Sequence, residues 1–137
     1  MGLYHKDELV MVVTYGRHHR GGNSTVLQRL ATKKLTLIVG GMSKLVSKLP
    51  RPLITWSDNR YSTGASYEKS GFVFDGELRP DYQYFRNEGR YKYKRYSKQS
   101  QKLKPDEKGQ GKTEAVLRAE QNFHRIYDAG KKRWRLD

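Results

Sequence analysis

The sequence predicts an α/β fold of the α+β kind, built on a mainly antiparallel sheet with two core helices and a basic C-terminal extension. Short runs rich in β-branched and aromatic residues recur through the first 96 residues, as is typical of strands. Two segments between these runs, at 42–49 and 64–70, carry helix signals. The 137 residues, 35% of them apolar, are enough for one modest core. We therefore expect a core at 1–96, a basic flexible linker at 97–112, and a C-terminal helix and small hairpin at 113–137, packed on or near that core.

Seven strands are expected in the first 96 residues, at 1–4, 8–15, 24–30, 52–56, 72–74, 82–85 and 90–96. The run ELVMVVTY at 8–15 is the clearest because it is rich in β-branched residues. A polar turn precedes it, so residues 1–4 are expected to fold back on it as a hairpin. Residues 24–30 alternate between apolar and polar, whereas PLITW at 52–56 is a short apolar run typical of a buried strand.

Helices and turns separate these strands. The pair Gly40-Gly41 breaks the chain before the helix at 42–49, whose apolar residues fall at helical spacing and which ends at a proline. A glycine also closes the second helix, at 64–70. The turn sequence NEG at 87–89 joins the last two strands and predicts a second hairpin.

The C-terminal third differs in composition from the rest. Residues 97–112 contain no aromatic or β-branched residue, which is typical of a linker. Residues 113–123 predict a helix. The aromatic and apolar residues of 124–137 flank Ala129-Gly130, and this arrangement predicts a terminal hairpin.

Positive charge is the most informative property of the chain. Its 28 Lys and Arg against 14 Asp and Glu leave a net charge of +14, and no acidic residue occurs between Glu8 and Asp58. Like charges at this density repel one another unless a polyanion neutralises them. Nucleic acid, in particular double-stranded DNA, is the expected partner, because counterion release supplies salt-sensitive affinity. No membrane partner is expected, since neither an amphipathic helix nor a lipidation signal is evident.

The densest cationic stretch runs from Arg86 to Lys104, where eight basic residues stand against the single acid Glu88. Tyrosines lie between them. The cations suit phosphates, and exposed tyrosine rings suit either unpaired bases or the backbone oxygens of a duplex. The alternative is a set of half-buried strand tyrosines beside a solvated lysine face. The candidate nucleic-acid contacts are Arg17, Arg20, Arg60, Arg86, Arg90, Lys92, Lys94, Arg95, Lys98, Lys102, Lys131, Lys132 and Arg133.

Strand alternation divides YKYKRY at 91–96 between two faces. It places Tyr91, Tyr93 and Arg95 on one face and the remaining residues, Lys92, Lys94 and Tyr96, on the other. One of these faces is expected to pack inward.

Several kinds of catalytic site are excluded by the composition. The chain has no cysteine, so it forms no disulfide, thiolate zinc site or cysteine nucleophile, and it suits a reducing compartment. Its four histidines lack metal-ligand spacing, and no metal site is expected. The acids from Asp58 to Glu77 do not form a nuclease motif. With no membrane-spanning run or signal peptide either, we expect a cytoplasmic protein.

The segment Gly40-Gly41-Met42-Ser43-Lys44 has the features of a phosphate cradle. Its glycines allow close backbone approach, and the helix start that follows offers unpaired N–H groups. A glycine pair at a strand-to-helix turn has a purely steric explanation as well, so the motif alone leaves both interpretations open.

Taken in order, the first hairpin, the third strand, the GGMSK helix start, PLITW and the segment GASYEKSGF at 64–72 resemble the core of GNAT acyltransferases. Many GNAT proteins end their fourth helix with Tyr-Glu-Lys-x-Gly-Phe, which is matched here by Tyr67, Glu68, Lys69, Gly71 and Phe72. The resemblance implies a fold that is N-terminally truncated, lacking the first strand and two helices of the full domain. A homodimer is one way to supply the missing strand.

The GNAT resemblance also implies a cofactor and a reaction. Acetyl-coenzyme A or coenzyme A would bind with its pyrophosphate on the backbone, and Ile38 stands where the family usually has Gln or Arg. Tyr67 would protonate the departing thiolate, with Asp58 as a second catalytic candidate. The residues implied for the cofactor are Gly41, Met42, Ser43 and Lys44.

A narrower similarity covers most of the chain. The segments SDNR at 57–60, GASYEKSGF, PDYQY at 80–84 and RIYDAG at 125–130 look like the C-terminal domain of phage homing-type endonucleases, and more distantly like Mom-type phage DNA-modification proteins. This similarity implies a phage-encoded, endonuclease-associated domain that binds or helps to process DNA in the host cytoplasm, with little or no sequence specificity. Two alternatives stay open, a coenzyme A-dependent acyltransferase acting on a DNA base or a protein, and an inhibitor that docks on an acidic host protein.

Overall fold

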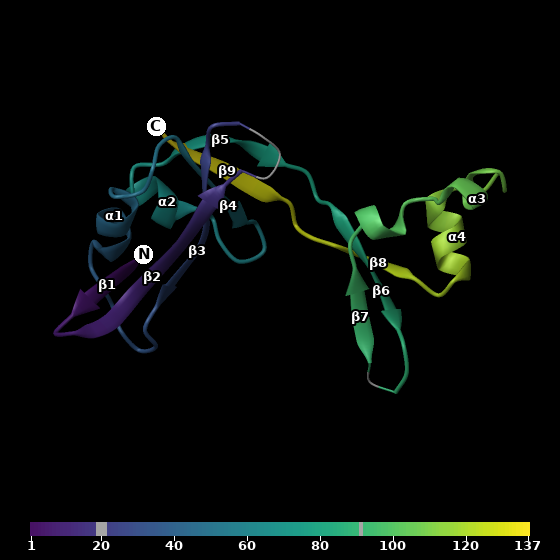
Figure 1. The fold of residues 1–137 in the computed structure, drawn as a ribbon, viewed down its shortest axis with the longest axis horizontal. Helices are drawn as coiled ribbons and strands as arrows, with labels where there is room; N and C mark the ends of the chain where they lie inside the picture. Colours follow the sequence, from purple (N-terminus) through teal and green to yellow (C-terminus); the bar gives the residue numbers. More distant parts are fainter. Residues whose placement is uncertain (19–21, 91) are drawn as a thin grey trace. The chain divides into compact units, whose positions relative to one another are not determined.

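The computed structural model describes residues 1–18, 22–90 and 92–137. It confirms a mixed α+β fold with a mainly antiparallel sheet and few, short helices. The chain forms two compact units (Figure 1). The first unit comprises Met1–Leu78 and Gly130–Asp137, and the second unit comprises Arg79–Ala129. The second unit is thus an insertion between two segments of the first, a division that differs from the predicted core, linker and C-terminal segment.

The first unit contains a six-stranded sheet in the order β1-β2-β3-β4-β9-β5. Its strands are β1 (Gly2–His5), β2 (Glu8–Arg17), β3 (Thr25–Thr32), β4 (Leu53–Asp58), β5 (Val73–Leu78) and β9 (Lys131–Leu136). Strands β1 to β5 confirm the strands predicted in this part of the sequence. All neighbours are antiparallel except β3 and β4, which pair in parallel over only two positions, Thr25 with Leu53 and Val26 with Ile54. A parallel pair needs a crossover, and the first helix supplies it.

Two helices accompany this sheet, α1 (Gly41–Val46) and α2 (Ala65–Lys69), and both confirm predicted helices. The core contains apolar residues of α1 and the turn after it, of the sheet and of the segment after α2, namely Met11, Val13, Leu27, Leu45, Val46, Leu49, Leu53, Phe72 and Trp134. Each such side chain contributes roughly 1.5–3 kcal/mol when fully buried. The apolar spacing read from the sequence is therefore the spacing that packs α1 on the sheet.

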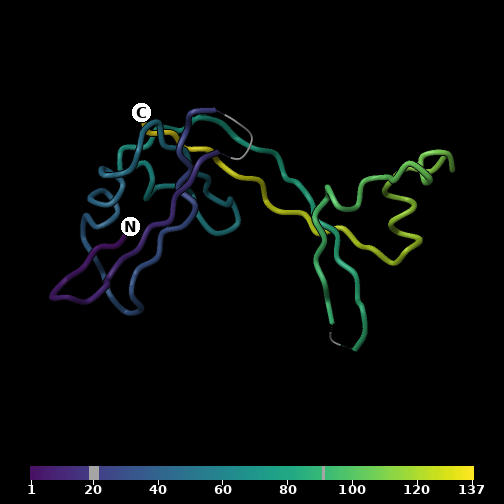
Figure 2. Tube along the Cα trace, viewed as in Figure 1, coloured from purple at the N-terminus to yellow at the C-terminus, as the bar shows by residue number. Residues whose placement is uncertain are grey.

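The last strand, β9, corrects the predicted terminal hairpin. Strands β8 (His124–Tyr127) and β9 lie in different sheets, and β9 pairs with β4 on one side and β5 on the other. Figure 2 shows the yellow C-terminal segment running beside earlier parts of the first unit. The physical reason is Trp134, which is buried in the core and donates its indole N–H to Ser57 Oγ at 2.9 Å. A two-stranded terminal hairpin would offer no such core to this ring.

The second unit contains a three-stranded antiparallel sheet in the order β7-β6-β8. It comprises β6 (Tyr82–Asn87), β7 (Tyr93–Tyr96), η1 (Gln99–Gln101), α3 (Pro105–Lys108), α4 (Glu114–Glu120) and β8. The predicted second hairpin is confirmed, with β7 beginning later than expected. The predicted helix at 113–123 is confirmed as α4, whose N-terminus is capped by Thr113 Oγ1 accepting the N–H of Val116.

Residues 97–112, predicted as a linker, contain η1 and α3 and are tied to α4 by Arg118. Its guanidinium donates to both carboxylate oxygens of Glu107 at 2.7 Å. It also donates to the backbone carbonyls of Gln101 and Lys102, at 2.9 and 3.2 Å. We call this arrangement the Arg118 clasp. Arg118 also donates to Gln121 Oε1 at 2.9 Å. Composition did not reveal the clasp, because it joins one arginine to single polar groups spread along the chain rather than to a cluster.

Across the parts of the chain that the structure describes, no helix is long and apolar enough to cross a membrane.

Candidate nucleic-acid interface

The sheet of the second unit has two unlike faces. Directly paired residues of antiparallel strands share a face, and alternate residues along a strand lie on opposite faces. Tyr84 pairs with Tyr96 on one side and Arg125 on the other, so these three lie on one face. Phe123, which follows α4, packs edge-on against Tyr84 and Tyr96, with ring centroids 6.1 and 5.1 Å away. We call this the inner face, and Tyr84 at its centre is 1% exposed.

Two arginines of the inner face are engaged in packing. The Arg86 guanidinium lies 4.6 Å from the Phe123 ring centroid and pairs with Glu88 at 3.1 Å. Arg125 lies 4.2 Å from the Tyr82 ring centroid and donates to the Tyr84 hydroxyl. Such cation–π contacts stabilise a fold when the cation is partly desolvated. Arg86, a predicted nucleic-acid contact, therefore has a structural role in holding this face.

A hydrogen-bond network completes the inner face. The Tyr84 hydroxyl donates to Glu114 at 2.8 Å while it accepts from Arg125. Burial, together with the bond to Glu114, raises the pKa of the Tyr84 hydroxyl despite the opposing effect of Arg125. The bond to Tyr84 in turn raises the pKa of the Arg125 guanidinium. Both groups therefore keep their protons at neutral pH, and the network is stable there.

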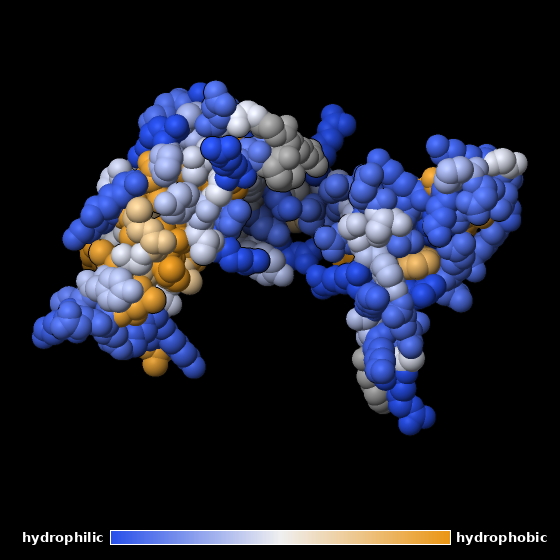
Figure 3. All heavy atoms as spheres, in the orientation of Figure 1, coloured by the Kyte–Doolittle hydropathy of each residue, from blue (hydrophilic) through white to orange (hydrophobic). Residues whose placement is uncertain are grey.

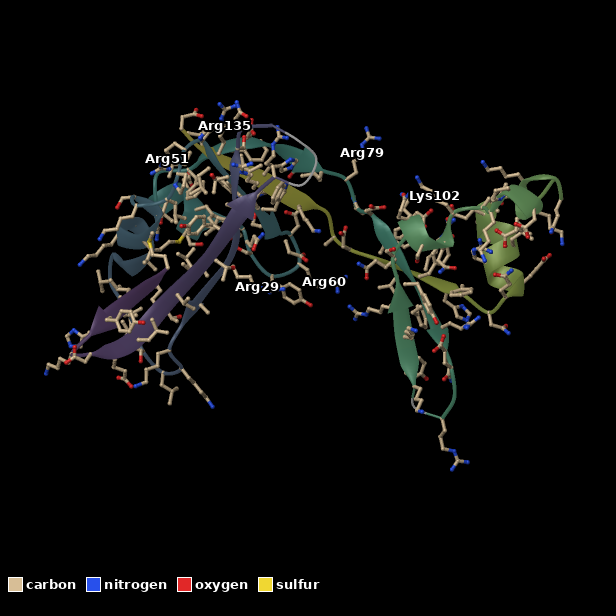
Figure 4. The ribbon with its side chains drawn as sticks, viewed as in Figure 1. Arg29, Arg51, Arg60, Arg79, Lys102 and Arg135 are labelled. Atoms are coloured by element: carbon tan, nitrogen blue, oxygen red, sulfur yellow. The ribbon has the colours of Figure 1, made fainter. Side chains whose placement is uncertain are left out.

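Lys98 is likewise engaged. Its Nζ donates to Asp81 at 2.9 Å and lies 4.4 Å from the Tyr82 ring centroid. The hydrogen bond to Asp81 is the main reason that the Lys98 pKa is raised. Lys102 and Arg79, both labelled in Figure 4, are exposed.

Four cations of the β6–β7 hairpin have exposed side chains. We call them the outward cations: Arg90, Lys92, Lys94 and Arg95. Lys94 Nζ lies 5.3 Å from the Tyr96 ring centroid, and no ion pair is found for the four among the described residues. Figure 3 shows that the visible face of the second unit is largely hydrophilic, in contrast to the apolar residues gathered over β1 and β2. The hairpin thus carries a concentrated positive charge that the protein itself does not neutralise.

The predicted contacts in the first unit are scattered. Arg17 is exposed at the end of β2, and the Arg60 guanidinium lies 5.9 Å from the Tyr61 ring centroid in the turn after β4. Arg20, like Tyr91 of the second unit, falls outside the described residues. The basic run at the start of β9 is partly committed to the fold. Lys131 and Lys132 are half-buried, and Arg133 pairs with Asp75 at 2.8 Å.

A cleft lies between β3, α1 and α2 in the first unit. Thr55 Oγ1 donates to the Leu27 carbonyl at 3.1 Å, beyond the two backbone pairs that join β3 and β4. The cleft has a volume of about 320 Å³ and is lined by Gln28, Arg29, Leu30, Met42, Ser66 and Tyr67. Figure 4 labels Arg29 at its β3 side. Two predicted site residues, Met42 and Tyr67, are therefore brought together.

The other predicted cofactor and catalytic residues lie elsewhere. Gly41 and Lys44 line a second hollow, of about 490 Å³, beside β1. The Ser43 hydroxyl donates to Ser70 Oγ at 3.5 Å. Asp58 is outside both hollows, and its carboxylate accepts the backbone N–H of Arg60 at 2.9 Å, as in a turn.

The tyrosine proposed as an acid has a packing role as well. The half-buried Tyr67 ring lies 5.6 Å from Phe72 and 6.2 Å from Trp134, centroid to centroid. Its position at the cleft is compatible both with packing in the core and with a role as a general acid.

Sequence reasoning missed the residues that β8 adds to the second unit. His124 lies directly across from Phe85 of β6, and neither was singled out. The signal available in the sequence was Phe85, an aromatic residue in the predicted strand at 82–85. Its partner lies about forty residues further along the chain, so no local pattern could pair them.

Searches against protein-family models, curated proteins and solved structures found no match to this chain. Among residues 1–18, 22–90 and 92–137, no group of three or more His, Asp or Glu could hold a metal ion.

Proposed function

We propose that this protein binds DNA through its phosphates, as a phage-type DNA-binding or DNA-processing accessory domain, with the β6–β7 hairpin as the contact surface. The observation that carries the proposal is the division of cations in the second unit. Arg86, Lys98, Arg118 and Arg125 make ion pairs or side-chain hydrogen bonds within the fold. The outward cations are exposed together on one hairpin, and no such bond is found for them among the described residues.

The outward cations suit a polyanion rather than a single charged group. Between Arg79 and Ala129 the sequence carries thirteen Lys and Arg and seven Asp and Glu, and most of the acids bind cations or tyrosines of the same unit. Phosphates along a nucleic acid form a line of negative charges, and release of their counterions provides the free energy of binding. A hairpin places several cations along that line.

Neutralising the exposed hairpin cations should weaken DNA binding strongly. For the triple variant Arg90→Gln, Lys92→Gln, Arg95→Gln, we expect the slope of log K against log salt on duplex DNA to fall by about 3. The affinity at 100 mM salt should fall by about tenfold or more, because three phosphate contacts are lost. Fluorescence anisotropy of a labelled duplex at several salt concentrations measures both quantities.

A matched triple variant separates position from net charge. Lys33, Lys112 and Arg135 each pair with a carboxylate, so changing all three to Gln removes the same charge away from the hairpin. This control should retain most of the salt slope. Equal losses in the two triple variants, or binding by the wild-type protein that does not depend on salt, would contradict the proposal.

A coenzyme A-dependent acyltransferase is the second candidate, and the cleft at Tyr67 favours it. A GNAT-like fold is supported by the single, short parallel pair between β3 and β4, by one helix on each side of β4 in the sequence, and by β9 lying between β4 and β5. Tyr67 lines the cleft between β3, α1 and α2 and could act as a general acid there.

Calorimetric titration with acetyl-coenzyme A tests the second candidate. A saturable heat is expected from the wild-type protein, and Ser66→Trp, which fills the cleft, should remove it. Leu35→Ser is a suitable control because this side chain is 97% exposed and lines neither the cleft nor the hollow beside β1. If the wild-type protein gives no heat of binding, the chain is not an acetyl-coenzyme A enzyme.

A further inference from the structure

The second unit exposes one whole face of its sheet. We call this the outer face, and it consists of Gln83, Phe85, Asn87, Tyr93, Arg95, His124 and Ile126. All of these residues are exposed except Phe85, which is half-buried. The opposite, inner face packs on α4 and Phe123, so the fold of this unit already has its core without the outer face.

Aromatic rings form the centre of the outer face. Phe85 is paired with Arg95 on one side and His124 on the other, and the Phe85 and His124 ring centroids are 5.2 Å apart at an interplanar angle of 36°. Tyr93 is 68% exposed and pairs with Asn87, two positions further along β6. Two strand positions span about 7 Å, so the Tyr93 and Phe85 rings can contact separate flat groups.

The outer face is also free of acidic residues. No acid lies within β6, β7 or β8. Just before β6, the Asp81 carboxylate accepts from the Tyr82 backbone N–H and from Lys98. Glu88 and Glu114 serve the inner face. Glu114 accepts hydrogen bonds from Tyr82 and Tyr84, and Glu88 binds Arg86 and the Tyr96 hydroxyl. Arg95 and His124 are the titratable side chains beside Phe85. A ligand on the strands of the outer face therefore meets rings and positive charge, and Asp81, just before β6, is paired with Lys98.

We propose that the outer face binds the unpaired bases of single-stranded nucleic acid, with Phe85 and Tyr93 as stacking rings and Arg95 as a phosphate contact between them. The inference rests on the proposed nucleic-acid function and names the form of nucleic acid that this face takes. Aromatic rings on an open sheet stack bases irrespective of sequence, because every base has a π-face. In a duplex both faces of each base are already stacked, so only unpaired bases can use these rings.

A base-free strand provides the decisive comparison. We would measure, by fluorescence anisotropy, the affinities for labelled (dT)12, for a 12-unit abasic strand with the same phosphates, and for a 12-base-pair duplex. Stacking contributes roughly 1–3 kcal/mol per base. We therefore expect (dT)12 to bind about tenfold or more tightly than the abasic strand.

Variants of the rings localise the effect. Tyr93→Ala should weaken binding of (dT)12 by about tenfold and leave binding of the abasic strand within about twofold, because only the base contact is lost. Tyr93→Phe keeps the ring and should restore the affinity, and Phe85→Leu tests the second ring while keeping an apolar side chain. Tyr4→Ala, an exposed tyrosine of β1 in the first unit, is the matched control. Circular dichroism checks that each variant is folded.

The outcomes separate this inference from the function on which it rests. Stacking on the outer face is overturned if (dT)12 and the abasic strand bind with equal affinity, or if Tyr93→Ala weakens binding of both equally. In either case, salt-dependent binding would still support the proposed function. Loss of (dT)12 binding in Tyr4→Ala but not in Tyr93→Ala also overturns stacking on the outer face. Failure of all three probes to bind overturns both proposals and leaves the outer face to a protein partner.

Discussion

Gly64→Ala should unfold the first unit more readily than any other single-methyl change in it. Gly64 precedes α2 with φ at +89°, and a Cβ built there would lie 2.0 Å from Cζ2 of Trp134. No real contact is this short, so the indole must move, and its hydrogen bond to Ser57 goes with it. The left-handed conformation costs roughly 1–2 kcal/mol for alanine, and overpacking adds roughly 1–3 kcal/mol. We expect a total loss of about 3 kcal/mol in the free energy of unfolding.

Gly71→Ala separates the two causes. Gly71 has φ at +90°, and a Cβ there would meet its nearest neighbour, Leu136 Cδ1, at an ordinary 3.6 Å. This variant should lose only the conformational part, about 1 kcal/mol. Both tryptophans, Trp56 and Trp134, lie in the first unit, so tryptophan fluorescence during urea denaturation reports that unit alone. Equal losses in the two variants would show that Trp134 does not confine Gly64.

Local patterns in the sequence were sufficient for most single elements. Strands β1 to β6 and helices α1, α2 and α4 each carry their own alternation, helical spacing or cap, and these signals act over a few residues. The alternation in 93–96 also placed Lys94 and Tyr96 on one face, where the structure has the ammonium over the ring. Pairing over long distances had no such signal. The chain leaves the first sheet after β5 and re-enters it at β9, between β4 and β5.

The candidate site shows the same limit. Composition found the tyrosines and cations of the hairpin, and alternation divided them between two faces. Which of the two faces is the inner one depends on α4 and Phe123. Arg86 and Arg90 look alike in the sequence, whereas Arg86 stacks on Phe123 and Arg90 is exposed in the hairpin turn. Which cations are available to a ligand is therefore a property of the tertiary structure.

The Arg118 clasp is the second feature whose loss should have a large effect. Arg118 is 2% exposed, and its donors serve Glu107, Gln121 and two backbone carbonyls. In Arg118→Met the methionine occupies similar volume but leaves these acceptors without a donor. Removing one partner of a buried ion pair costs about 3 kcal/mol or more. We expect residues 97–112 to lose their protection from hydrogen exchange and the second unit to unfold at lower urea concentration.

Two further variants test the clasp geometry. Arg118→Lys keeps the charge but presents a single ammonium, so it can donate to fewer of the acceptors. The stability of the second unit in this variant should lie between those of the wild type and Arg118→Met. Arg79→Met, at an exposed position of the same unit, removes the same charge and should change little. Hydrogen exchange followed by mass spectrometry resolves the segment at 97–112. If protection of this segment from hydrogen exchange is unchanged in Arg118→Met, η1 and α3 are stable without the clasp.

The clasp should also have a characteristic pH dependence. The bonds from Arg118, followed by the Lys104 backbone N–H, lower the pKa of Glu107 from 4.5 to about 2. A carboxyl whose pKa is lower in the folded state contributes stability that is fully present above its unfolded pKa and is lost as pH falls through its folded pKa. The stability gap between the wild type and Arg118→Met should therefore stay constant above about pH 5 and shrink between 4.5 and about 2. The free energies of unfolding of the second unit in the two proteins are measured by urea denaturation at several pH values, with hydrogen exchange of that unit as the signal. A gap that keeps its full size at pH 2.5 would show that Arg118 stabilises the unit by packing rather than by its pair with Glu107.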